Sequence, residues 1–209
     1  MKPIIPTIAL ALLCCTPNAW SAVAGEVEGI PVEDSYMVDG GKLVLNGAGM
    51  RKRAYFKTDV TSIYLSAPRN SIEGIEAAPG GKRIHLVILR DIPGSTASRY
   101  FINDFKAVAT DAEFKQLINE IGQLGEIYSK IRQVNKGDVF NIDWVPGKGI
   151  SSSLNGKPMV LDGNPATYMN NELMYRLMVR MYLTSGGSSE MRENLLGRSR
   201  SMLNPPRTP

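Results

Sequence analysis

The sequence has few of the side chains that carry metal, disulfide or nucleophilic chemistry. It contains two cysteines, Cys14 and Cys15, and one histidine, His85. That supply is too small for a structural zinc site with four Cys or His ligands, and a Ser-His-Asp triad would have to recruit His85. Since His85 sits inside the apolar run Ile84–Val87, we interpret it as a structural or surface-facing strand histidine.

Nucleotide-binding and paired-carboxylate motifs are also missing. The sequence has no Gly-Lys-Ser/Thr phosphate loop and no Rossmann glycine fingerprint. Asp138 and Asp143 could be read as a catalytic pair, but their spacing on a strand points them to opposite faces. We interpret them as solvated strand charges and expect no metal and no cofactor.

The basic excess belongs to the ends of the chain. There are 24 basic and 20 acidic residues, a formal charge of +4. Lys2 and the three arginines of residues 198–209 account for this excess, so residues 25–197 are neutral by count. Lysine and arginine do not cluster as nucleic-acid binding requires, so no nucleic-acid partner is predicted. The Pro- and Arg-containing end, 198–209, predicts a disordered basic tail.

Only one apolar run is long, and it lies at the N-terminus. Lys2 precedes the run Ile4–Cys15, and Ala22-Val23-Ala24 follows as a small-residue cleavage site, with Ala19-Trp20-Ser21 as a weaker alternative. The run is short for a membrane span, so residues 1–24 are predicted to be a signal peptide; an uncleaved anchor is the alternative. Export would take the protein to the periplasm or the medium, and cleavage would remove both cysteines.

Apolar periodicity predicts alternating groups of strands and helices. Strands are expected over residues 26–31, 36–45, 54–65, 83–89, 138–145, 150–154 and 157–161. Helices are expected over residues 97–108, from 110 to 121, around 127–134, and over 169–183 and 189–196. This order indicates a single α+β domain, residues 25–197, with a mainly antiparallel sheet and helices on one face.

Local signals mark several boundaries. Asn46–Gly49 predicts a turn, Thr110–Glu113 a capping box, and Asn155-Gly156 a two-residue hairpin. Ser188 or Ser189 is expected to cap the last helix.

The candidate site is a basic triplet, Arg51-Lys52-Arg53, placed after the predicted glycine turn and leading into a long strand. An arginine held there presents a fixed fork of donors that suits a carboxylate or phenolate better than a lysine does. Tyr55, Lys57 and Asp59 share one face of that strand by alternation. A solvated basic loop is the alternative reading.

Several blocks together resemble the chalcone isomerase-like family, in its exported bacterial branch. The blocks are Leu43–Arg51 with Tyr55–Lys57 and Ile63–Leu65, then Arg83–Asp91 with Ser95–Val108, then Gly137–Gly147 with Leu154–Lys157, and last Asn170–Leu183 with the short helix ending at Gly197. The resemblance implies an open-faced β-sandwich, in which helices cover a large antiparallel sheet and leave a pocket between the layers. It also implies a cofactor-free protein.

The resemblance assigns roles to four residues. Arg51 matches the family's functional arginine, which stabilises negative charge in the enzymes and holds the carboxylate in fatty-acid binders. The enzymes' threonine and tyrosine positions fall on Asp59 and near Thr96, with Tyr100 one helical turn away. The water-orienting pair is therefore not reproduced, and Thr58 is expected to face the other side of the strand.

Three functions follow from this reading. The first is a non-catalytic binder of a small amphipathic acid such as a fatty acid, with Arg51 as a clamp. The second is an isomerase that closes a chalcone-like substrate by intramolecular oxa-Michael addition. The third is a structural or partner-binding role with a vestigial pocket. Four methionines of the closing helix (Met169, Met174, Met178 and Met181) are interpreted either as an adaptable pocket wall or as plain core; the oligomeric state stays open.

Overall fold

A seven-stranded antiparallel sheet forms the centre of the computed structural model, in the order β11-β10-β9-β6-β5-β4-β3. The structure describes residues 22–159, 169–185 and 187–206, so most of the predicted signal peptide lies outside the described residues. The sheet strands are β3 Ser35–Val38, β4 Gly41–Arg53, β5 Phe56–Leu65, β6 Lys82–Ile88, β9 Val139–Val145, β10 Gly149–Leu154 and β11 Lys157–Met159. Two small pairs complete the strands: β1 Val23–Val27 with β2 Ile30–Glu33, and β7 Ile92–Pro93 with β8 Gln133–Val134.

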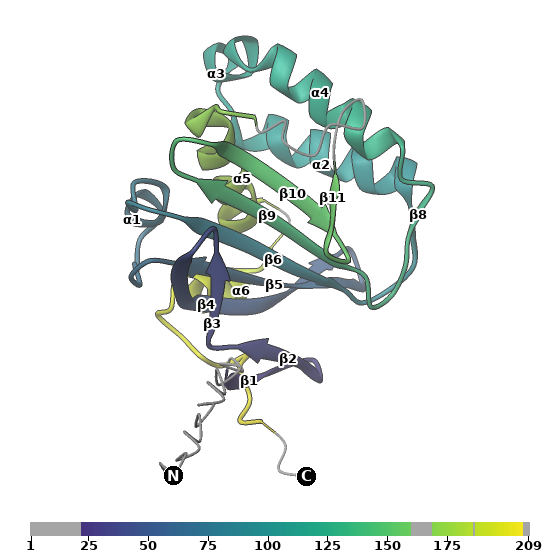
Figure 1. Cartoon of the computed structure of the whole chain (residues 1–209). Helices are drawn as coiled ribbons and strands as arrows, with labels where there is room; N and C mark the ends of the chain where they lie inside the picture. The colour runs from purple at the N-terminus through teal and green to yellow at the C-terminus, as the bar shows by residue number, and fades with distance from the viewer. Residues whose placement is uncertain (1–21, 160–168, 186, 207–209) are drawn as a thin grey trace, which may run out of the picture.

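Helices cover one face of this sheet (Figure 1). They are α1 Ile72–Glu76, α2 Gly94–Val108, α3 Asp111–Gln116, α4 Ile118–Ser129, α5 Glu172–Thr184 and α6 Ser189–Leu195. The main core lies between the layers, where Ile63, Ile84 and Ile142 of the sheet meet Phe105 and Leu177 of the helices. The predicted α+β class, with a large antiparallel sheet covered by helices, is confirmed.

Strand alternation gives the sheet a second buried face. Ala48, Met50 and Val60 point away from the helices and pack under the β1–β2 hairpin, against Val27 and Val32. Beyond the irregularity at Asn46, the odd-numbered residues of β4 and β5 on this stretch, including Arg51 and Asp59, therefore point toward the helices. This parity places both side chains in the space between the layers.

Most element predictions are confirmed, but the helix expected around 127–134 is wrong, because α4 ends at Ser129 and Gln133–Val134 form strand β8. The capping box at Thr110 and Glu113 is present, and Ser188 caps α6 through the backbone N–H of Met191. Asn155 and Gly156 turn the β10–β11 hairpin with φ angles of 51° and 74°. None of the helices in the described ranges combines the length and the apolar run needed to cross a bilayer.

Two predicted strands are wrong at their centres. The stretch 26–31 is the β1–β2 hairpin, with φ of 53° at Glu28 and 76° at Gly29, and 36–45 contains a turn with φ of 47° at Asp39 and 78° at Gly40. Two consecutive positive φ angles are the signature of the tight turn that matches strand twist. Periodicity hides both turns because apolar residues continue on either side.

The predicted turn at Asn46–Gly49 is wrong in the opposite sense, because these residues lie inside β4. A Cβ on Gly47 would stand 1.9 Å from the carbonyl oxygen of Asn194 and 2.7 Å from that of Leu195. Glycine is needed here so that the end of α6 can touch the strand. Arg51 consequently lies within a strand and not at the exit of a loop.

The C-terminal segment is ordered as far as it is described. Glu26 and Asn204 exchange two backbone hydrogen bonds of 2.8 and 2.9 Å, and the Arg198 Nε–H donates to the carbonyl oxygen of Asn70 at 2.6 Å. Leu203 packs with Val27 and its neighbours. Residues 198–206 are thus a packed extension of the domain and differ from the disordered tail that composition predicted.

Candidate functional site

A cavity of about 110 Å³ lies between the sheet and helices α2, α4 and α5. Its walls are mainly apolar; among the apolar residues are Leu86, Ile88, Phe101, Phe140, Ile142 and Met181. Its polar lining includes two arginines, Arg51 and Arg53, and two aspartates, Asp59 and Asp104. Pockets of this kind, apolar with a few convergent polar groups, are typical small-molecule sites.

Arg51 is the most enclosed cation of the site, with 8% of its surface exposed. It lies opposite Asp59 in the β4–β5 register, and both its Nε and its Nη2 are 2.9 Å from Asp59 Oδ1. The guanidinium also lies over the ring of Tyr182, 4.7 Å from its centroid. Burial alone would lower the pKa of Arg51, but the Asp59 carboxylate, together with Tyr182 and Asp104, outweighs burial and the pKa is raised.

A β-bulge in β5 brings Thr58 to the wall of the cavity. Arg51 pairs with Asp59 and Lys52 with Lys57, so Thr58 is an extra residue on β5. The Thr58 hydroxyl lies 2.9 Å from Asp59 Oδ1 and 3.1 Å from the carbonyl oxygen of Arg51. The expectation that Thr58 faces the other side of the strand is wrong, because the bulge interrupts the alternation on which it rested.

Asp59 accepts hydrogen bonds from several side chains. Besides Arg51 and Thr58, the hydroxyl of Thr61 donates to its Oδ2 at 2.7 Å. Only 2% of Asp59 is exposed. A buried carboxylate with this many donors is a fixed internal counter-ion, since removing it from its partners would leave an uncompensated charge.

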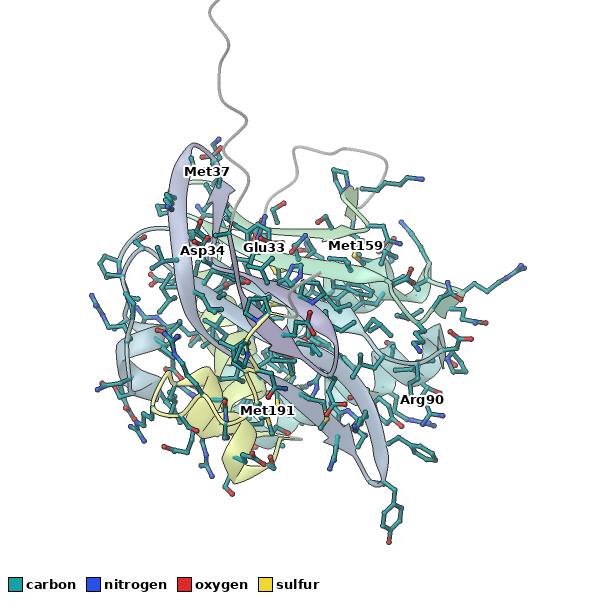
Figure 2. The ribbon with its side chains drawn as sticks, turned by 90° about the horizontal axis from the view of Figure 1, so that it is seen from below. Glu33, Asp34, Met37, Arg90, Met159 and Met191 are labelled. Carbon is teal, nitrogen blue, oxygen red and sulfur yellow. The ribbon has the colours of Figure 1, made fainter. Side chains whose placement is uncertain are left out.

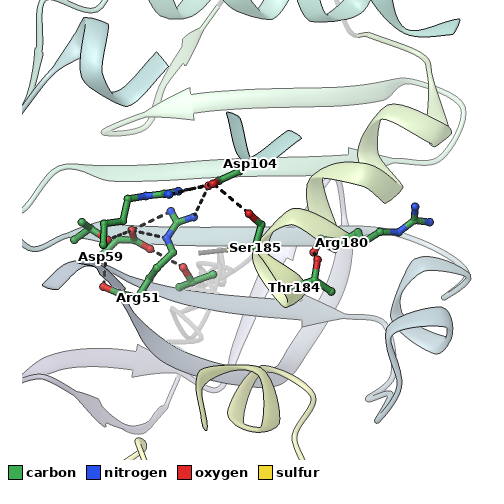
Figure 3. A network of polar contacts seen from close by, with 9 residues as sticks. Arg51, Asp59, Asp104, Arg180, Thr184 and Ser185 are labelled. Carbon is green, nitrogen blue, oxygen red and sulfur yellow. Dashed lines mark hydrogen bonds and ion pairs between the residues drawn. The ribbon is translucent and has the colours of Figure 1, made fainter. Parts of the chain in front are cut away.

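A second ion pair joins the sheet to the helices (Figure 3). Arg53 donates through both terminal nitrogens to the Asp104 carboxylate, in the bidentate arrangement that arginine favours. The hydroxyl of Ser185, just after α5, donates to Asp104 Oδ1 at 3.2 Å, while Arg51 Nη1 lies 3.8 Å from Asp104 Oδ2. The two arginines and two aspartates thus form one charge-balanced cluster.

Three of the four residues named from the sequence lie at this cavity. Arg51 and Asp59 are in direct contact, and Tyr100 also lines the cavity, with its ring 4.5 Å below the Arg53 guanidinium. Thr96 lines a separate outer pocket of about 160 Å³. Of the closing-helix methionines, Met181 reaches the cavity, whereas Met174 and Met178 are buried in the core without lining it.

Sequence reasoning missed Asp104 and Tyr182, and it placed Arg53 in the basic triplet without giving it a role of its own. Arg53 carried a usable signal, because a residue two positions from Arg51 on a strand points to the same side. Asp104 follows Tyr100 by one helical turn on an otherwise apolar face, which is an unusual place for an acid. Nothing in the sequence singles out Tyr182 from the other apolar residues of α5.

His85 takes no part in this site. Its Nδ1 is 2.7 Å from Asn141 Oδ1, and its ring centroid is 5.3 Å from that of Tyr36. Burial lowers the pKa of His85. The interpretation as a structural strand histidine is confirmed. The described residues contain no group of three His, Cys, Asp or Glu side chains placed to hold a metal ion.

Fold and site together define a class: α+β proteins in which helices cover a large antiparallel sheet and enclose a pocket carrying buried arginine. Residues 24–197 match the model of the family described as chalcone isomerase-like. The chain therefore belongs to the chalcone isomerase-like family.

A solved structure shares the fold at low sequence identity. The fatty-acid binding protein of Arabidopsis thaliana superposes with a TM-score of 0.64 at 14% identity, over 85% of this chain and 98% of that one. At this identity the likeness concerns the fold alone. The search of curated proteins gives no match.

Proposed function

We propose that the protein binds a small amphipathic acid, such as a fatty acid, and does not transform it. The observation that carries this proposal is the position of Arg51, buried beneath helices and lining a cavity with mainly apolar walls. An acyl chain would occupy the apolar part, and the carboxylate would meet the guanidinium. The fatty-acid binding neighbour supports this ligand class for the shared fold.

One nitrogen of Arg51 has no hydrogen-bonded carboxylate and could meet the ligand head group. Arg51 uses Nε and Nη2 for Asp59, while the 3.8 Å gap between Nη1 and Asp104 is longer than a hydrogen bond. A ligand oxygen at Nη1 would leave both ion pairs in place. Tyr182, which lies beside the guanidinium, would donate its hydroxyl proton to the same oxygen.

Asp59 opposes the ring-closure chemistry and also limits the affinity for an acid. An oxa-Michael ring closure builds negative charge on the substrate carbonyl, and the arginine would have to stabilise it. Here the guanidinium already holds a buried carboxylate at 2.9 Å, which opposes a further full negative charge through like-charge repulsion. This repulsion also makes the affinity for an acid moderate, since the cluster is balanced before the ligand arrives.

A calorimetric titration with laurate and with lauryl alcohol tests the proposal. Arg51→Gln should weaken laurate binding about tenfold or more and leave the alcohol within about twofold, because only the acid uses the charge. Lys52→Gln, which removes an exposed cation next in the chain, is the matched control and should change neither. Ala97→Trp, on the cavity wall, should abolish both. Equal laurate affinity in wild type and Arg51→Gln would contradict the clamp.

We also propose that the protein is exported to the periplasm or the medium by cleavage of the N-terminal segment. Strand β1 begins at Val23, and Ala22 accepts a hydrogen bond from the Asp34 N–H at 2.7 Å. A cut after Ser21 would therefore keep β1 whole, whereas a cut after Ala24 would shorten it. Intact-mass measurement of the protein from fractionated cells identifies the site, and a full-length mass would contradict cleavage.

A further inference from the structure

A second, outer pocket adjoins the inner cavity near the turn between β4 and β5. The pocket that contains Thr96 shares Arg53, Thr58, Ile92 and Tyr100 with the inner cavity, so the two spaces adjoin. Arg53, tied to Asp104 and stacked on Tyr100, stands between them. A ligand reaching the inner cavity from this side would pass through the outer pocket and displace one arginine side chain.

The mouth of this outer pocket carries exposed aromatic side chains. The turn between β4 and β5 places Tyr55 97% exposed and Phe56 57% exposed. Phe56 lines the outer pocket directly, and the Arg90 guanidinium lies 4.0 Å above its ring. Exposed large apolar residues are few among the described residues, so two adjacent ones at a pocket mouth point to a surface that is covered during function.

The tip of the β4–β5 hairpin, residues 52–57 with Arg90 beside it, carries an excess of positive charge. Lys52 and Lys57 are exposed beside the turn, and Arg90 stands over it. Lys57 pairs with Glu28, but no carboxylate of the described residues lies within ion-pair distance of Lys52 or Arg90. Aromatic rings flanked by cations are the side chains that settle at the head-group level of a membrane, especially an anionic one.

We propose that this tip, residues 52–57 with Arg90, docks on an anionic lipid surface and brings the outer pocket to that surface. The proposal rests on the proposed function, and it names the source of the ligand: an amphipathic acid leaves the leaflet, enters beside Phe56 and passes Arg53 into the inner cavity. Figure 2 shows Arg90 beside the free end of the β4–β5 hairpin, with Met37 on the opposite side of the view.

Cosedimentation of the full chain with vesicles tests the docking. Vesicles of phosphatidylglycerol and phosphatidylcholine should bind the protein about tenfold more strongly than pure phosphatidylcholine, with loss at high salt. The double change Tyr55→Ser with Phe56→Ser should weaken binding about fivefold or more, and Arg90→Gln should weaken it on anionic vesicles only. Met37→Ser, at an apolar residue about as exposed as Phe56 (63% against 57%), is the matched control and should have no effect.

The N-terminal apolar run is present in every variant, so a second measurement isolates the tip. Tyr55→Trp should give fluorescence that brominated lipids quench, beyond the background of Trp20 and Trp144, whereas Met37→Trp should not. Quenching that is absent, or equal at both positions, overturns the proposal and indicates a different partner or general adsorption. Laurate titration without vesicles separates the two hypotheses. Tyr55→Ser, at a residue that lines neither pocket, should bind laurate as wild type does. A wild-type protein that binds laurate but does not dock on anionic vesicles overturns only the docking.

Discussion

The charge cluster of the cavity depends on a few residues whose partners are set by strand register. Because Arg51 lies opposite Asp59 in the β4–β5 ladder, this ion pair forms as soon as the two strands pair. Asp104 arrives from α2 and completes the cluster through Arg53. Each arginine thus enters the interior with a carboxylate, as buried charges require.

Removing the Asp59 charge should make the site more selective for acids. In Asp59→Asn the ligand carboxylate no longer faces a fixed negative group beside Arg51, so laurate should bind about tenfold more tightly. Lauryl alcohol should bind as before. Calorimetric titration of both ligands measures the difference; equal gains for acid and alcohol would instead indicate a change in cavity shape.

His85 should make stability depend on pH near neutrality. Its pKa is lowered by burial from the usual 6.5, so between the two pKa values the unfolded chain binds a proton that the folded chain does not. The free energy of unfolding should therefore fall as the pH drops below about 6.5, toward the folded-state pKa. Urea titrations at several pH values should show this slope in wild type and lose it in His85→Gln; an unchanged slope in the variant would assign the effect to other groups.

At the scale of elements, the contact between α6 and β4 fixes how close a helix can come to the sheet. The carbonyl groups that end α6 lie against the backbone of Gly47, where no side chain fits. Asn46, the extra residue of a second bulge, donates from its Nδ2 to the carbonyl oxygen of Leu195 at 2.8 Å. Glycine and asparagine therefore act together here as a docking point for the last helix.

Substituting Gly47→Ala should destabilise the protein by about 1–3 kcal/mol, since a methyl group would displace the α6 backbone. Gly122→Ala is the matched control: Gly122 is helical, and a methyl group added there would meet no atom within 4 Å. That change should stabilise by about 0.5–1 kcal/mol. Urea denaturation measures both, and a neutral Gly47→Ala would mean that α6 moves away freely.

Gly47 and Gly49 show why the sequence pattern predicted some elements correctly and misplaced others. Helix starts are encoded locally, by Thr110 with Glu113 and by Ser188, so their positions are readable from the sequence. Gly47 and Gly49 look like a turn because glycine permits both tight turns and close approach. Only the contact with α6, about 150 residues further on in the chain, decides between these readings.

At the scale of the whole molecule, the site exists because helices close over one face of a curved sheet. Class and sheet arrangement were predictable from the order of strands and helices, and the resemblance located Arg51. The cluster around it was not predictable, because Asp104 and Tyr182 come from helices that meet the sheet only in the folded chain. The bulge at Thr58 likewise depends on pairing between strands and leaves no mark in either strand alone.

Ligand binding should stabilise the whole domain by mass action. Saturating laurate, at about 100 times its Kd, should add about 2.7 kcal/mol to the free energy of unfolding, since the unfolded chain has no cavity. Thermal unfolding with increasing laurate measures this as a rising Tm. Ala97→Trp, which fills the cavity, should show a Tm that does not respond to laurate, and an equal response in that variant would place the ligand elsewhere.

The central claim is that Arg51 anchors the polar end of an amphipathic acid inside the cavity. The most direct measurement is a crystal structure with a fatty acid that carries bromine at its methyl end, located by anomalous scattering. We expect the carboxylate within hydrogen-bond distance of the Arg51 guanidinium and the bromine among the apolar wall residues near Phe101 and Ile142. An empty cavity at saturating acid, or a carboxylate bound away from Arg51, would contradict the account.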